Sequence, residues 1–144
     1  MNPYISWGKE MKLGFIIIYV DDVKETLAFY QNAFGLTIRL EHEDNGQVLY
    51  GELETEGAIL GFASHVMGEM NLNGHYEKVT LEKKPCGQEI VFVVDDINSS
   101  YNKALAAGAI SIVEPAEKPW GQTVAYLRGK EGTLIELCTP MNGE

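Results

Sequence analysis

An internal repeat is the feature that most constrains this chain, because residues 15–62 recur in altered form as residues 89–137. Val20-Asp21-Asp22-Val23 is matched by Val94-Asp95-Asp96-Ile97. Further pairs follow in the same order: Ala33-Phe34-Gly35 with Ala106-Ala107-Gly108, Gly46-Gln47 with Gly121-Gln122, and 56–62 with 131–137. No single pair is persuasive alone. The ordered series, with an almost constant offset, indicates two copies of one structural unit.

The first copy is predicted to run β-α-β-β-β. The apolar run 13–20 predicts a strand that is buried on both faces. An N-cap at Asp22, apolar residues at four- and three-residue spacing, and Gly35 as the terminating glycine predict a helix over 23–34. Strands are expected at 36–43, 47–54 and 58–64, the first two joined by an Asn-Gly turn.

The second copy repeats this order. A strand is expected at 89–94, and a helix that begins after Asp96 and ends at Gly108. A short strand at 110–113 is followed by a loop at 115–121 that carries Trp120. Two more strands are expected, at 123–128 and 133–139.

The domain organisation follows from the repeat. Residues 1–12 are predicted to form an N-terminal arm and 13–65 the first module. Residues 66–88 are predicted to form a linker and 89–144 the second module, all within one domain of 144 residues. The linker is long for a compact domain, so we expect it to cover part of the structure.

Composition excludes some classes of function. The net charge is −10, with 11 basic and 21 acidic residues, which argues against nucleic-acid binding but suits a cationic ligand. No apolar run is long enough to cross a membrane, and no signal peptide is visible. Cys86 and Cys138 lack the spacing of a metal knuckle or disulfide framework. We therefore expect a cytoplasmic protein without nucleic-acid or membrane partners.

Four short patterns carry a resemblance to a known superfamily. They are V-D-D, F-Y-x-x-x-F-G, W-G-Q-T-V-A-Y and E-G-T-L-I-E-L, at 20–22, 29–35, 120–126 and 131–137. In paired β-α-β-β-β units they resemble the vicinal oxygen chelate superfamily of glyoxalases, bleomycin-resistance proteins and extradiol dioxygenases, over about residues 13–140. The resemblance implies an α+β fold in which two tandem βαβββ modules form a curved mixed sheet around a cavity. It also implies a homodimer.

The resemblance further implies where a metal would bind. The metal-dependent members place ligands at the start of the first strand and in the last strand of each module. These positions here are Phe15, Gly61, Glu89 and Glu136. Two carboxylates are fewer than the three protein donors that a transition metal needs, so we expect no metal and no cofactor. A metal would require His65 or His75 to fold back from the linker.

Strand alternation suggests which side chains face the implied cavity. The candidate ligand-binding residues are Glu89, Glu136, Phe15, Tyr19, Trp120 and Tyr126. Carboxylates beside aromatic rings suit a cationic or flat aromatic compound. Other interpretations stay open: Glu136 as a structural residue bonded to backbone, Glu89 as a solvent-exposed group, and Trp120 as a cap on the core or dimer seam. No catalytic residue is identified.

Three functions are compatible with these observations. The leading hypothesis is a metal-independent binding protein, resembling bleomycin-resistance proteins, that sequesters a cationic or aromatic compound in an acidic-aromatic cavity. The alternative is a glyoxalase- or dioxygenase-like metal-dependent enzyme with a non-standard metal site. A third is a sensing or interaction subunit whose cavity is vestigial. Whether the chain is an enzyme stays open.

Overall fold

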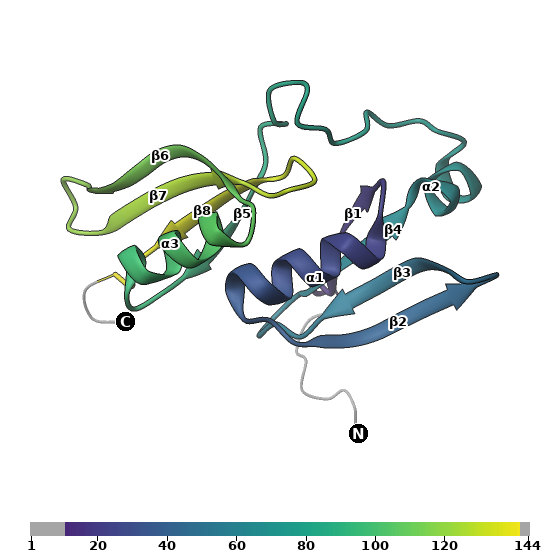
Figure 1. Cartoon of the computed structure of the whole chain (residues 1–144), viewed down its shortest axis with the longest axis horizontal. Coiled ribbons are helices and arrows are strands. Elements are labelled where there is room, and N and C mark those ends of the chain that lie inside the picture. The colour runs from purple at the N-terminus through teal and green to yellow at the C-terminus, as the bar shows by residue number, and fades with distance from the viewer. Residues whose placement is uncertain (1–10, 142–144) are drawn as a thin grey trace.

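The structure, a computed structural model, describes residues 11–141. The predicted N-terminal arm thus lies almost entirely outside the described residues. The rest of the chain forms two modules, each with a four-stranded mixed sheet and a helix, as Figure 1 shows. The predicted α+β fold of two tandem βαβββ modules is confirmed, as two separate sheets that do not close.

The elements of the two modules correspond one to one. The first module contains β1 (Phe15–Val20), α1 (Val23–Phe34), β2 (Ile38–Asp44), β3 (Gln47–Leu53) and β4 (Ile59–Ser64). The second contains β5 (Glu89–Val93), α3 (Ile97–Ala106), β6 (Ile110–Glu117), β7 (Thr123–Arg128) and β8 (Leu134–Cys138). The strand orders are β1-β4-β3-β2 and β5-β8-β7-β6, so β1 and β5 are edge strands, each parallel to its one neighbour.

Local capping fixes both helices of the repeat. Asp22 accepts a hydrogen bond from the backbone N–H of Glu25 at 3.0 Å, and Asp96 accepts one from Ser99 at 3.1 Å. Gly35 ends α1 in the left-handed conformation, with φ of 70°. The predicted helix over 23–34 is confirmed to the residue.

One hydrophobic core joins the modules. Helices α1 and α3 pack against each other, side by side in Figure 1, and each covers its own sheet. Phe34 of α1 meets Phe92 of β5 with ring centroids 4.7 Å apart. Tyr30 of α1 donates a 2.7 Å hydrogen bond to Glu131, in the turn between β7 and β8. The two modules therefore share one packed core.

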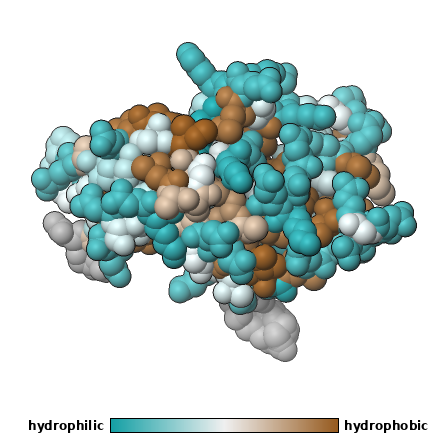
Figure 2. Space-filling model, viewed as in Figure 1, coloured by the Kyte–Doolittle hydropathy of each residue, from teal (hydrophilic) through white to brown (hydrophobic). Residues whose placement is uncertain are grey.

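The prediction that the first strand is buried on both faces is wrong. β1 is an edge strand, and Phe15, Ile16 and Ile17 are exposed. A continuous apolar run is typical of a strand inside a sheet, but here the sheet stays open beside it. Apolar residues also appear on the face seen in Figure 2, as separate brown patches between hydrophilic side chains.

The predicted linker is partly helical. α2 (His65–Leu72) follows β4 directly, with Ser64 accepting from the N–H of Met67 and Asn73 ending the helix at φ 51°. Gly68 lies inside α2, and the two capping residues hold the helix although glycine disfavours it. The predicted strand at 110–113 is also too short, because β6 continues to Glu117. In the part of the chain described here, no helix is long and apolar enough to span a membrane.

From residue 73 to 88 the chain crosses from α2 to β5 (Figure 1). Arg128 anchors this crossing, donating to the carbonyls of Lys83 at 2.7 Å and Thr80 at 2.8 Å. It also donates to Gly132 O. A Cβ at Gly132 would lie within 3.0 Å of the Thr80 backbone, and φ there is 114°. The linker is thus fastened to the second module by contacts that need glycine and arginine.

Candidate functional site

Each sheet has one face on its helix and one face turned away from it. Leu53 and Leu127 are fully buried in the core, so their neighbours along the strand point to the opposite face. Two matching rows of side chains cross these outward faces. The first row is Ile17, Gly61, Glu52 and Leu40, and the second row is Val91, Glu136, Tyr126 and Val113. Gly61 and Glu136 occupy equivalent places, as the sequence repeat indicates.

The second row carries an acidic cluster with Glu89. Desolvation, a hydrogen bond to Glu136 and the charge of Glu136 raise the pKa of Glu89 to about 7. Desolvation raises the pKa of Tyr126 as well, and the two carboxylates raise it further. Near neutral pH the pair therefore holds one or two negative charges beside an aromatic ring. Such a group can attract a cation or hold a proton at Glu89.

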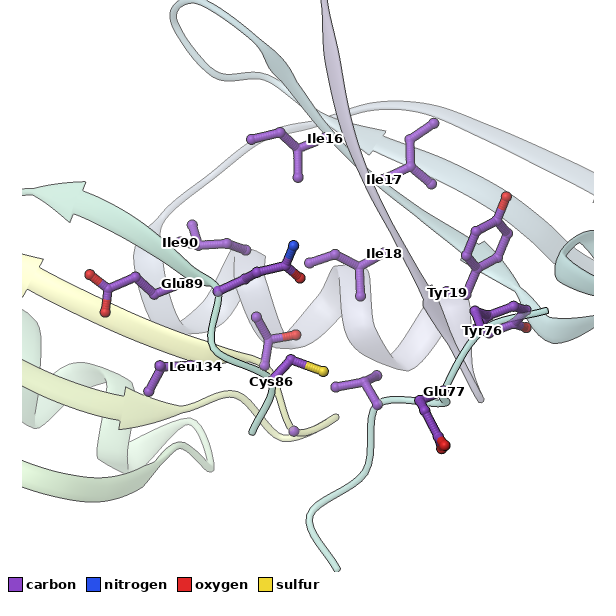
Figure 3. A pocket seen from close by; sticks show the side chains of 14 residues that line it. Ile16, Ile17, Ile18, Tyr19, Tyr76, Glu77, Cys86, Glu89, Ile90 and Leu134 are labelled. Atoms are coloured by element: carbon purple, nitrogen blue, oxygen red, sulfur yellow. The ribbon is translucent and has the colours of Figure 1, made fainter. Parts of the chain in front are cut away.

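A cavity of about 460 Å³ opens between β1 and β5, and we call it the seam cavity. Figure 3 shows Tyr19 and Tyr76 together at one end, with Glu89 and Leu134 at the other. Isoleucines from both edge strands line it between these ends. The linker contributes Tyr76, Glu77, Val79, Cys86 and Gln88, so it forms part of the cavity wall. Glu89 belongs to both the acidic cluster and this cavity.

The tyrosine end of the seam cavity is held by α2. The rings of Tyr19 and Tyr76 lie 5.0 Å apart, and Asn71 donates to Tyr19 Oη at 3.3 Å. His65 Nδ1 hydrogen-bonds Tyr76 Oη at 2.7 Å, and its Nε2 lies 3.0 Å from Asp21 Oδ1. These contacts fix the start of the linker against the first module.

The side chains present do not fit a transition-metal site. The four implied ligand positions supply two carboxylates, since Phe15 and Gly61 have no donor. His65 is engaged with Asp21 and Tyr76, and His75 is exposed in the linker. Across residues 11–141, no three His, Cys, Asp or Glu side chains gather so that they could hold a metal ion. We therefore derive no chemical step through a metal.

Three of the six predicted ligand-binding residues, Glu89, Glu136 and Tyr126, are brought together. Phe15 and Tyr19 lie on β1 of the other sheet, with Phe15 53% exposed. Trp120 is 57% exposed in the β6–β7 turn, where its Nε1 donates to Gln122 Oε1 at 2.8 Å. The start of β7, which follows Trp120, pairs with Cys138 at the end of β8, and Cys138 pairs with Val93 at the end of β5. Glu89 is the first residue of β5. Trp120 therefore lies at the other end of the sheet from Glu89.

Sequence reasoning missed a polar cluster in the first row. Glu52 is only 6% exposed and lies directly opposite Gly61. Its Oε1 lies 3.0 Å from Arg39 Nε in an ion pair. Tyr50 donates to the other carboxylate oxygen at 2.6 Å. Desolvation and this hydrogen bond raise the pKa of Tyr50. Alternation along β3, with Gly51 and Leu53 facing α1, was the signal that could have placed Tyr50 and Glu52 beside Gly61.

Comparisons with known proteins agree with this architecture. The sequence profile of the glyoxalase-like domain matches residues 13–142. The uncharacterized protein YraH of Bacillus subtilis is 28% identical over 131 residues, covering 88% of this chain and 97% of its own length.

Solved structures share the fold. A glyoxalase/bleomycin resistance protein/dioxygenase family enzyme from Burkholderia phytofirmans matches with a TM-score of 0.76 and 24% identity, over 90% of this chain and 98% of its own. TioX from a Micromonospora species matches with a TM-score of 0.67 and 20% identity, over the same shares of the two chains. With the paired βαβββ modules and the profile match, the chain belongs to the glyoxalase-like family of the vicinal oxygen chelate superfamily.

Proposed function

We propose that this protein is a metal-independent small-molecule binding protein that sequesters a cationic or aromatic compound. The ligand would contact Glu89, Glu136 and Tyr126 and extend into the seam cavity. The observation that carries the proposal is the position of the two carboxyl groups on one face: Glu136 lies opposite Tyr126, and the exposed Glu89 begins the neighbouring strand β5. The raised pKa of Glu89, about 7, agrees with the closeness of the pair. No third metal donor joins this pair among the described residues.

The physical argument is electrostatic. Two carboxyl groups that repel each other are stabilised when a cation lies between or beside them. The face of Tyr126 adds cation–π attraction, which grows as water is excluded. A cavity of about 460 Å³ lies in the range that small organic ligands occupy. Its isoleucine lining would cover the apolar part of such a ligand.

A homodimer in the cytoplasm is part of this proposal. Phe15, Ile17, Val91 and Val93 are large apolar residues exposed on the two edge strands. Exposed apolar groups that lie near one another often mark a protein interface. A second copy of the chain would cover them and narrow the access to the acidic cluster. Sedimentation equilibrium would detect the dimer, and a monomer at all concentrations would contradict it.

The binding test uses acriflavine, a cationic aromatic dye, and anthracene-2-carboxamide as an uncharged aromatic comparison. We expect isothermal titration at about pH 8.5, where Glu89 is ionised with or without Glu136, to show that Glu136→Gln weakens acriflavine binding by about fivefold or more, since one unit of charge is lost. Glu56→Gln removes the same charge at an exposed position and should leave the affinity unchanged. Wild-type affinity for acriflavine should rise as pH increases through about 7, because Glu89 then loses its proton. Equal affinity of wild type and Glu136→Gln would contradict the charge pairing.

Metal content tests the remaining part of the proposal. Purified protein should contain no stoichiometric metal after incubation with zinc, nickel, manganese or iron(II). A stoichiometric metal that disappears in Glu136→Gln would replace this proposal with the metal-dependent enzyme.

A further inference from the structure

We propose that the outward face of the first sheet carries a second binding site, which receives the carboxylate of a small organic acid at Arg39. This inference does not depend on a cationic ligand at the second module. It rests on the Nη groups of the partly exposed Arg39 side chain, on the ion pair between Arg39 and Glu52, and on the hydrogen bond by which Tyr50 fixes Glu52.

The two arginines of the chain differ in how their guanidinium groups are used. Arg128 is buried, and its N–H groups make four hydrogen bonds to backbone carbonyls. Arg39 is bonded through Nε to Glu52, and its side chain is 45% exposed. Within residues 11–141, neither Nη atom of Arg39 makes a hydrogen bond. The outer edge of this planar group is therefore available to an acceptor.

The guanidinium of Arg39 is held in place by Glu52, a buried residue of the neighbouring strand β3. Glu52 is almost completely buried, and both of its oxygens are occupied, one by Arg39 Nε and one by Tyr50 Oη. The hydroxyl of Tyr50 uses space left by Gly61, where a Cβ would come within 2.9 Å of it. A guanidinium that is fixed before binding loses less conformational entropy when it binds.

The same arrangement selects the kind of ligand. Because each oxygen of Glu52 already accepts from Arg39 or Tyr50, this carboxylate is poorly available to a cation. Arg39 offers paired donors, which match the two oxygens of a planar carboxylate. Leu40, next to Arg39 on β2, is 45% exposed and would contact the apolar body of a small ligand. The structure thus fits an aromatic or aliphatic monocarboxylate.

Benzoate is the probe, and the Nε–Hε signals of the two arginines in a ¹⁵N-labelled sample are the readout. Benzoate should shift the Arg39 signal saturably and leave the Arg128 signal in place. Arg39→Lys keeps the charge but loses the planar pair of donors, so its affinity for benzoate should fall about tenfold. Lys24→Gln, which removes an exposed positive charge on α1, should bind benzoate as wild type does.

Glu52→Gln gives a test of opposite sign. This change removes the negative charge that neutralises Arg39, so benzoate should bind more tightly, by about threefold or more. Circular dichroism would verify that each variant is folded. The proposal is overturned if benzoate leaves the Arg39 signal unmoved, if Arg39→Lys binds benzoate as tightly as wild type, or if Glu52→Gln weakens binding in a folded protein.

Discussion

The two outward rows have the same frame and different chemistry. Both end in exposed apolar residues, Ile17 and Leu40 in the first module and Val91 and Val113 in the second. At the centre, the first row has Gly61 beside Glu52, and the second has Glu136 beside Tyr126. The carboxylate has thus changed strands between the modules. In the first it is neutralised by Arg39, and in the second it faces another acid, Glu89.

The difference shows which side of each sheet is constrained by folding. Leu53 and Leu127, which face the helices at equivalent positions of the two modules, are both fully buried. None of the residues of the two outward rows belongs to the hydrophobic core cluster, so they can change without loss of the core. A duplicated module can therefore keep its fold while each copy acquires a different polar group.

The largest expected effect tests the shared core. Leu53→Ala and Leu127→Ala should each lower the free energy of unfolding by about 2 to 5 kcal/mol, because each leaves a cavity in the core that the helices share. Urea unfolding followed by circular dichroism should show a single transition for both variants. A separate transition for one module would contradict the single cooperative unit.

A smaller effect separates the two arginines. Arg128→Lys should cost about 2 to 3 kcal/mol of stability, because it leaves buried carbonyls of the linker without a donor. Arg39→Lys should cost less than about 1 kcal/mol, because its ion pair is partly exposed. Urea midpoints compare the two variants. Equal losses would mean that Arg39 has a structural role like that of Arg128.

The smallest expected effect concerns pH and the acidic cluster, because Glu89 is exposed and solvent screens its charge. The pKa of Glu89 is about 7 in the folded protein and 4.5 as its ordinary value, so the folded state holds this proton more tightly than the unfolded chain. Stability contributed by this group is greatest at low pH and is lost as pH rises from about 4.5 to 7. Glu89→Gln should lessen this decline, whereas Glu56→Gln should not. Urea midpoints at pH 5, 6, 7 and 8 test this, and equal slopes for wild type and Glu89→Gln would contradict it.

The sequence was a good guide to the framework. Periodicity and capping residues predicted α1 to the residue, and the repeat paired Phe15 with Glu89 and Gly61 with Glu136, as the strand registers now show. These features depend on contacts within one module, which local patterns report. The helix α2 was not predicted: the polar, glycine-containing composition of 66–88 indicated a linker, although Ser64 and Asn73 cap a helix there.

The site was harder to predict because it depends on neighbours across strands. The burial of Glu52 could not be predicted from its neighbours in the sequence, because its ion-pair partner Arg39 comes from another strand, β2. The apolar sequence of β1 indicated a strand buried on both faces, yet an exposed edge strand can have the same sequence. Trp120 belongs to one of the most specific sequence patterns, but its ring lies far along the sheet from Glu89. Composition identifies the residue types of a site, and register decides which of them meet.

The open edge of β1 has a consequence for how the protein behaves at high concentration. Six consecutive apolar or aromatic residues with a free backbone edge form a segment of the kind that adds strands from other molecules and starts aggregation. No proline or charged residue lies within it, and the nearest charged residues are Lys12, three residues before Phe15, and Asp21, directly after Val20. Solubility therefore depends on whatever occupies this edge, and a lysine at Ile16 would act as a gatekeeper that native β1 lacks.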